Sequence, residues 1–120
     1  MFELKILTHF AAAHQLRMVA KKCENLHGHN WKVEVCVAGD RLNDAGVLID
    51  FGELKARVNA IIATLDHKFL NELNLFGGNP SSEKIAVYIA ETLAPQLPAS
   101  ARVSRVTTWE SEDACATYIP

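Results

Sequence analysis

Residues 2–14 read FELKILTHFAAAH, and their apolar side chains fall on alternate positions. A period of two is typical of a strand that buries one face, and its parity places His14 on the buried side. Residues 27–38, HGHNWKVEVCVA, repeat this alternation, and here His27 and His29 fall on the apolar side. The two segments therefore predict a pair of neighbouring strands that decide the fold and carry histidines on their apolar faces.

The pattern changes after Asp50, where apolar residues recur every three or four positions. Asp50 followed by Glu53 resembles a capping box, so we predict an amphipathic helix from this point. A second helix is expected after the turn-forming sequence GGNP, with Asn79 as its N-cap and Pro80 at its first position. The apolar stripes of the two helices are Phe51, Leu54, Val58, Ile61, Ile62 and Leu65, and then Ile85, Ile89 and Leu93.

Two further strands are expected near the C-terminus, in RVSRVTTWES (102–111) and CATYI (115–119), around a tight turn. The order of elements is then strand, strand, helix, helix, strand, strand (ββααββ). The simplest solution is an α+β fold, with a four-stranded antiparallel sheet and both helices on one face. Such a sheet has two open edges, and pairing between copies of the chain is one way to protect them, so we expect a symmetric oligomer.

The chain has 120 residues, of which 49% are hydrophobic and 22% are charged, and its formal net charge is −2. This composition predicts one globular domain spanning residues 1–120. The charge argues against electrostatic binding of nucleic acid, and no stretch offers the roughly 18 apolar residues of a membrane span. Three cysteines, an odd number, suit a reducing compartment better than a disulfide framework, so we expect a cytoplasmic protein without nucleic-acid or membrane partners.

The three histidines on the apolar faces form the first candidate site. Residues i and i+2 of a strand share a face, so His27 and His29 can point at one ion, and His14 on the neighbouring strand can complete the set. Three imidazoles with a fourth position open are typical of a catalytic zinc site. The alternative from the residues alone is that they are ordinary core or surface histidines.

Four more residues are candidates for chemistry, each with an ordinary alternative. Cys23, four residues before His27, is a fourth metal ligand, an activated base or nucleophile, or a thiol without a role. Asp66 and His67 are adjacent at the end of the first helix, where they either lower the pKa of a thiol or are solvated charges. Glu110 lies near the end of a strand and is either a rim residue or a carboxylate that accepts two hydrogen bonds from a guanidine-like edge.

These pieces, in this order, resemble the 6-pyruvoyltetrahydropterin synthase and 6-carboxytetrahydropterin synthase family. The matching segments are FAAAH (10–14), CENLHGHNW (23–31), GVLIDFGELK (46–55), LDHKFLNE (65–72), NPSSE (79–83) and WES (109–111). The resemblance implies one domain of this type with the tunnelling fold, in which sheets from several subunits join into an oligomeric barrel. It also implies a homohexamer, a dimer of trimers, with active sites at subunit interfaces.

The resemblance also implies a role for each candidate residue and a substrate, the small molecule 7,8-dihydroneopterin triphosphate. The metal ligands, for Zn²⁺, would be His14, His27 and His29. The catalytic residues would be Cys23 as proton acceptor, with Asp66 and His67 tuning it. The pterin ring of the substrate would be bound by Glu110.

The spacing between Cys23 and His27 resembles the branch of the family that forms a 6-carboxy product. That reaction releases 6-carboxy-5,6,7,8-tetrahydropterin, acetaldehyde and triphosphate, on the route to 7-deazaguanine and queuosine. The pyruvoyl branch, which eliminates triphosphate and keeps the side chain, and a non-catalytic zinc or pterin-binding module are the alternatives. Many relatives of the carboxy branch have a basic residue directly after the first histidine. Here Gln15 stands there, with Arg17 two positions later, which leaves the triphosphate contacts open.

Overall fold

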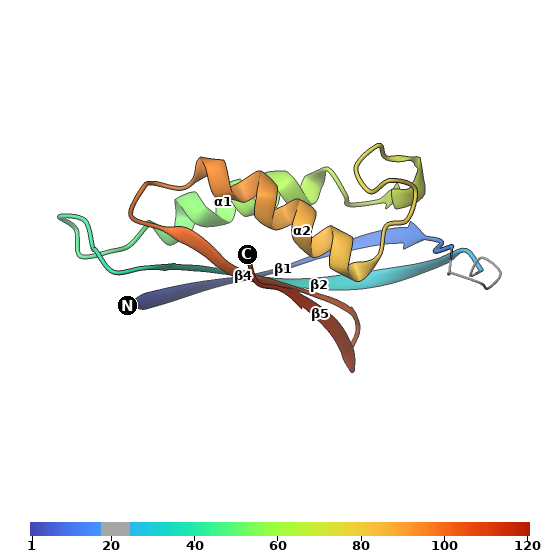
Figure 1. The fold of residues 1–120 in the computed structure, drawn as a ribbon, viewed down its shortest axis with the longest axis horizontal. Coiled ribbons are helices and arrows are strands. Elements are labelled where there is room, and N and C mark those ends of the chain that lie inside the picture. The colour runs from blue at the N-terminus through green and yellow to red at the C-terminus, as the bar shows by residue number, and fades with distance from the viewer. Residues whose placement is uncertain (18–24) are drawn as a thin grey trace.

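The computed structural model describes residues 1–17 and 25–120. Within them the two helices pack on the same face of the sheet, as predicted, and the other face carries no helix (Figure 1). The elements, in chain order, are β1 (Phe2–His14), β2 (His27–Gly39), α1 (Phe51–Ala63), β3 (Lys68–Phe69), the 3₁₀ turn Leu70–Glu72, α2 (Ser82–Leu93), the 3₁₀ turn Ala94–Gln96, β4 (Arg102–Ser111) and β5 (Ala114–Tyr118).

The two longest strands of the sheet are β1 and β2. The two strands run antiparallel over their full length, from Phe2 opposite Gly39 to His14 opposite His27. Thirteen residues at about 3.3 Å each span about 43 Å, and these long strands account for the elongated shape of 54 × 27 × 25 Å. The alternation read from the sequence is confirmed, because the inward side chains of both strands join the core with those of the helices.

The sheet has five strands in the order β3-β1-β2-β4-β5, so the prediction of a four-stranded, purely antiparallel sheet was wrong. The additional strand, β3, pairs in parallel with residues 12 and 13 of β1. The chain reaches it through His67, whose φ of 57° turns the backbone and whose N–H donates to the Ala11 carbonyl at 2.6 Å. A strand of two residues has no alternation, so no sequence pattern indicated it.

The two helices confirm the periodicity but correct two details. The Asp50 carboxylate caps α1 by accepting from the N–H of Glu53, as predicted, whereas Phe51 is 52% exposed and does not belong to the buried stripe. Helix α2 is capped by Ser81, whose hydroxyl oxygen accepts from the N–H of Lys84. The prediction that Asn79 caps this helix was wrong, because its side-chain amide binds the backbone of Arg17 instead. No helix among the described residues is long and apolar enough to cross a membrane.

Candidate metal centre

Three histidine side chains meet at the end of the β1–β2 pair. His14 lies directly opposite His27, and Ala12 lies opposite His29, so the strand register places all three on the helix-facing side. One nitrogen from each ring can be chosen so that the three atoms lie within 4.8 Å of one another. His14 is fully buried. The structure therefore brings together the three residues that the sequence singled out.

Backbone carbonyls fix the proton on two of these rings. Nδ1 of His14 lies 2.8 Å from the carbonyl oxygen of Pro80, and Nδ1 of His27 lies 2.7 Å from that of Asn25. A carbonyl oxygen can only accept, so each Nδ1 carries a hydrogen, and in its neutral form each ring then presents a lone pair at Nε2. The carbonyls thus set the tautomer that a metal ligand needs.

The two Nε2 atoms of His14 and His27 face each other at 2.9 Å. When both rings are neutral, two lone pairs at this distance repel unless a cation lies between them. Ligands around a tetrahedral zinc ion with bonds of about 2.05 Å are about 3.3 Å apart, so a small adjustment of the rings would admit the ion. The donor set and its hydrogen bonds fit a divalent metal such as zinc.

A pair of buried hydroxyls fastens the start of α2 beside this centre. Thr108 donates its hydroxyl hydrogen to the Ser82 carbonyl at 2.8 Å, and the Ser82 hydroxyl lies 3.0 Å from the Thr108 carbonyl and 2.6 Å from the Thr108 hydroxyl. These bonds tie α2 to β4 two residues after Pro80. They therefore help to hold the carbonyl that orients His14.

Glu110 lies beside the histidines. Its carboxylate oxygen is 3.5 Å from Nε2 of His14, and its side chain is 33% exposed. Glu110 also lines an open pocket together with Asn30 and Trp109. A carboxylate in this place has one side near the proposed metal position and another side open to a ligand.

Asp66 and His67 form a second cluster, at the edge of β1. The Asp66 carboxylate accepts from the N–H of Ala11 at 2.9 Å and pairs with Nδ1 of His67 at 3.0 Å. The Ala11 hydrogen bond, with a smaller contribution from His67, lowers the pKa of Asp66. The His67 side chain is 82% exposed and shares one surface hollow with His29. Cys23 lies outside the described residues, so its relation to this pair stays a prediction.

Comparison with known proteins decides the family. Residues 3–120 match the family model described as 6-pyruvoyl tetrahydropterin synthase. The chain belongs to this family. The resemblance noted from the sequence motifs is thereby confirmed, over nearly the whole chain.

The relatives of this chain in the 6-pyruvoyl tetrahydropterin synthase family are named after more than one enzymatic activity. A putative 6-carboxy-5,6,7,8-tetrahydropterin synthase of Archaeoglobus fulgidus is 41% identical over 90% of this chain and 87% of its own length. A dihydroneopterin monophosphate aldolase of Pyrococcus furiosus is 35% identical over 87% of this chain and 85% of its own. A solved structure, the 6-pyruvoyl tetrahydropterin synthase of Caenorhabditis elegans, has a TM-score of 0.85 at 24% identity, covering 99% of this chain and 95% of that one, and supports the fold alone.

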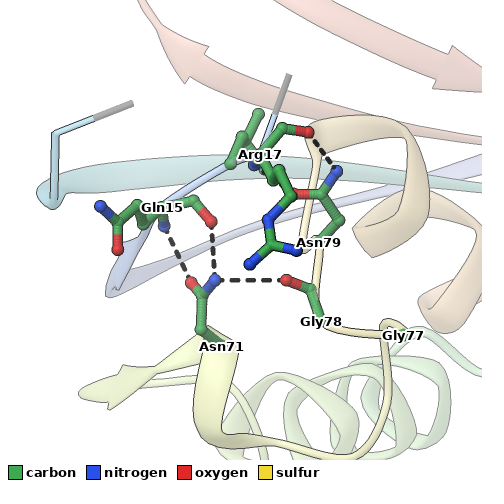
Figure 2. Close-up of a pocket in the computed structure, with 7 residues that line it drawn as sticks. Gln15, Arg17, Asn71, Gly77, Gly78 and Asn79 are labelled. Atoms are coloured by element: carbon green, nitrogen blue, oxygen red, sulfur yellow. Dashed lines mark hydrogen bonds between the residues drawn. The ribbon is translucent and has the colours of Figure 1, made fainter. Parts of the chain in front are cut away.

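The contacts of two asparagines with the chain that follows His14 were not predicted from the sequence. Asn71 accepts from the N–H of Gln15 at 2.8 Å and donates to its carbonyl at 2.6 Å. Asn79 does the same for Arg17, at 2.7 and 3.0 Å. Figure 2 shows Asn71 and Asn79 reaching the chain that continues beyond His14. Asn79 begins the segment NPSSE (79–83), one of the segments that resemble the family. That resemblance was the signal in the sequence that pointed to the loop before α2.

We predict that the Thr108 hydroxyl matters to the metal centre. Thr108→Val keeps the shape and removes the hydroxyl, so the start of α2 and the Pro80 carbonyl lose a fixed position. Losing a group that orients a metal ligand typically costs about 10- to 100-fold in affinity, and we expect a loss in this range by competition with a chromophoric chelator. Thr108→Ser keeps the hydroxyl and should stay close to wild type. Equal losses in both variants would instead assign the effect to packing.

A second prediction concerns acid unfolding. Because hydrogen bonds hold the folded-state pKa of Asp66 below its unfolded value of about 3.9, the ionised carboxylate stabilises the fold above that value. This stabilisation is lost as the pH falls through the folded-state pKa. Between about pH 4 and pH 2 the free energy of unfolding should therefore fall less steeply in Asp66→Asn than in wild type, in urea titrations at each pH. The exposed Asp44→Asn should follow wild type, and an equally steep Asp66→Asn would contradict the prediction.

Proposed function

We propose that this protein is a zinc-dependent lyase that converts 7,8-dihydroneopterin triphosphate and water into 6-carboxy-5,6,7,8-tetrahydropterin, acetaldehyde and triphosphate, in 7-deazaguanine and queuosine biosynthesis. The observation that carries the proposal is the 2.9 Å approach of the Nε2 atoms of His14 and His27 in a three-histidine cluster. The membership of the chain in the 6-pyruvoyl tetrahydropterin synthase family supports it. Relatives named 6-carboxy-5,6,7,8-tetrahydropterin synthase in Synechocystis (42% identity) and Bacillus subtilis (35%) support this branch.

In this proposal His14, His27 and His29 would hold the zinc ion, and a site with three protein ligands would leave room for the substrate. Zinc, when bound, supplies a Lewis acid that makes protons near the coordinated substrate oxygens more acidic. Pro80 and Asn25 keep two of the rings in the binding tautomer through their carbonyls.

Other residues of the chain would bind the substrate and move protons. Glu110 would accept hydrogen bonds from the ring N–H and amino group of the pterin, which places the substrate side chain beside His14. Cys23, as a thiolate, would take a proton from the side chain. His67 would then relay that proton, and Asp66 would hold its ring through Nδ1.

The same proposal includes a cytoplasmic homohexamer, a dimer of trimers whose sheets join into a barrel with active sites at the interfaces. Strand β3 covers only residues 12 and 13 of β1, so most of that long edge has no partner among the described residues of its own chain. The apolar side chains of Phe2 and Leu7 are exposed on the same strand. Pairing with another copy is a natural way to satisfy such an edge.

One second candidate is favoured by the relative from Pyrococcus furiosus, a dihydroneopterin monophosphate aldolase. An aldol cleavage would break the bond between the first two side-chain carbons. The second carbon would lose its hydroxyl proton to become an aldehyde on a phosphate ester, and the first would gain a proton. The same zinc ligands and proton-transfer residues would serve this chemistry. The pyruvoyl elimination and the non-catalytic binding module differ from both reactions in their products.

The experiment that tests the proposal offers both substrates to the zinc-loaded protein. The protein is incubated anaerobically with 7,8-dihydroneopterin triphosphate and, separately, with the monophosphate, and the products are identified by mass spectrometry with an acetaldehyde assay. A 6-carboxy pterin with acetaldehyde supports the proposal. A 6-hydroxymethyl pterin from the monophosphate would replace it with the aldolase, a pyruvoyl product would move it to the other branch, and two unchanged substrates would favour a binding module.

A further inference from the structure

A polar pocket, drawn in Figure 2, lies where the chain continues beyond β1, and none of the three clustered histidines is among its described lining residues. Both walls of the pocket connect directly to His14. On one side Gln15 follows His14 in the chain, and on the other Asn79 precedes Pro80, whose carbonyl accepts the His14 hydrogen bond. The pocket is therefore close to any substrate bound at the metal. The described residues that line it are Gln15, Leu16, Arg17, Asn71, Gly77, Gly78 and Asn79.

The walls of this pocket are held by the two asparagines. Each side-chain amide binds both the N–H and the carbonyl of one residue, Asn71 at Gln15 and Asn79 at Arg17, in the way that a neighbouring strand would. Asn71 also donates weakly to the Gly78 carbonyl at 3.4 Å, which links the two walls. A pocket fixed in this way loses little conformational freedom when a ligand binds.

Among the residues that the structure describes, the lining of the pocket carries a positive charge. Arg17 is the one ionised side chain in this described lining, which includes no carboxylate. The Arg17 guanidinium makes no hydrogen bond or ion pair with any part of the chain that the structure describes, and in the view of Figure 2 it points toward Asn71 and Gly78. A second cation is near, because Lys84 donates to the Phe76 carbonyl at 2.9 Å and its Nζ would lie 3.7 Å from a Cβ added at Gly77.

The glycine loop keeps this wall open. Gly77 and Gly78 have φ values of 61° and 83°, a backbone conformation that other residues adopt only with strain. A Cβ at Gly78 would meet no atom of the described residues within 4 Å. The sequence thus combines a turn that glycine favours with free space at the wall of the pocket.

We propose that this pocket binds the phosphate end of the substrate, with Arg17 as its principal cation. The inference rests on the proposed function in one respect, that the substrate is a phosphorylated pterin. A guanidinium presents a planar set of N–H donors that matches phosphate oxygens in pairs. Many relatives of the carboxy branch carry a positive charge directly after the first histidine, where this chain has the uncharged Gln15. Arg17, two positions later, would supply that charge instead.

Calorimetric titration of inorganic triphosphate into the zinc-loaded protein tests the proposal, with zinc content measured before and after. Arg17→Ala should weaken binding by about 10- to 100-fold, the size expected for hydrogen bonds to a charged group, while Arg17→Lys should recover part of it. Arg41→Ala is the matched control, because Arg41 is also exposed but follows the opposite end of β2. It should bind within about twofold of wild type, as surface charges far from the ligand contribute little.

Three results would overturn the inference: no binding by wild type, equal binding by Arg17→Ala, or an equal loss in Arg41→Ala. The titration needs no turnover, so it remains decisive if the proposed reaction fails. If the protein converts its substrate but triphosphate binding does not depend on Arg17, the phosphate site is refuted and the proposed reaction is not. A titration that depends on Arg17, without turnover of either pterin, would retain the phosphate site and refute the reaction.

Discussion

Replacing His14 by alanine is expected to release the metal and to lower turnover by about a thousandfold or more. A Lewis-acid metal supplies several kcal/mol of catalysis, and each 1.36 kcal/mol is a factor of about ten in rate. His27 and His29 alone would hold a zinc ion poorly, because a catalytic site normally has three protein ligands. The loss is measured as zinc per chain by mass spectrometry after gel filtration, and as turnover under the conditions that test the proposed function.

The same change should also lower the stability of the protein without metal. His14 is fully buried, so alanine leaves a cavity and removes the donor to the Pro80 carbonyl, each worth about 1 kcal/mol or more. His9→Ala is the control for metal content, because His9 is an exposed histidine on the same strand whose parity places it on the opposite face of the sheet. Full zinc occupancy in His14→Ala would show that this residue is not a ligand.

Cys23→Ala is expected to keep zinc and to lose turnover by about 10²- to 10⁴-fold, the usual contribution of a positioned acid or base. The family resemblance makes Cys23 the proton acceptor, so its removal should leave the three histidine ligands intact. Zinc content and turnover are measured on the same preparation, which separates the two roles. Cys115→Ala is the control, because that thiol is exposed on β5.

The competing roles of Cys23 give different results. Loss of zinc together with activity would make the thiol a fourth ligand, and the proposed proton transfer would then be wrong. Wild-type turnover would show that the thiol has no role in the reaction. Cys23→Ser adds a graded test, since a serine hydroxyl has a far higher pKa than a thiol and should recover little of the rate.

The sequence predicted the clustering of the three histidines well because strand periodicity is a local property. The parity of residues 2–14 and 27–38 was enough to place His14, His27 and His29 on one face, and the observed register confirms it. The proximity of Glu110 to the centre was implied by the family resemblance alone. It depends on the long-range pairing of β4 with β2, which periodicity cannot supply.

The parts that the sequence did not predict involve backbone atoms. The Pro80 carbonyl that orients His14 and the peptide groups bound by Asn71 and Asn79 exist at every position of a chain, so residue type does not identify them. The misplaced cap at Asn79 has the same origin. Asparagine favours caps because its amide competes for nearby backbone groups, and here the groups it binds belong to residue 17, 62 positions earlier in the sequence.

The distance along the chain between the histidines and the Pro80 carbonyl sets an order of events during synthesis on the ribosome. All three histidines lie between residues 14 and 29, whereas Pro80 follows His29 by 51 residues. At about 5 to 20 residues per second, the imidazoles are made about 3 to 10 seconds before the carbonyl that selects the ring nitrogen of His14. A nascent chain that captures a metal in this interval can use either nitrogen of His14. The arrival of α2 then leaves only Nε2 available.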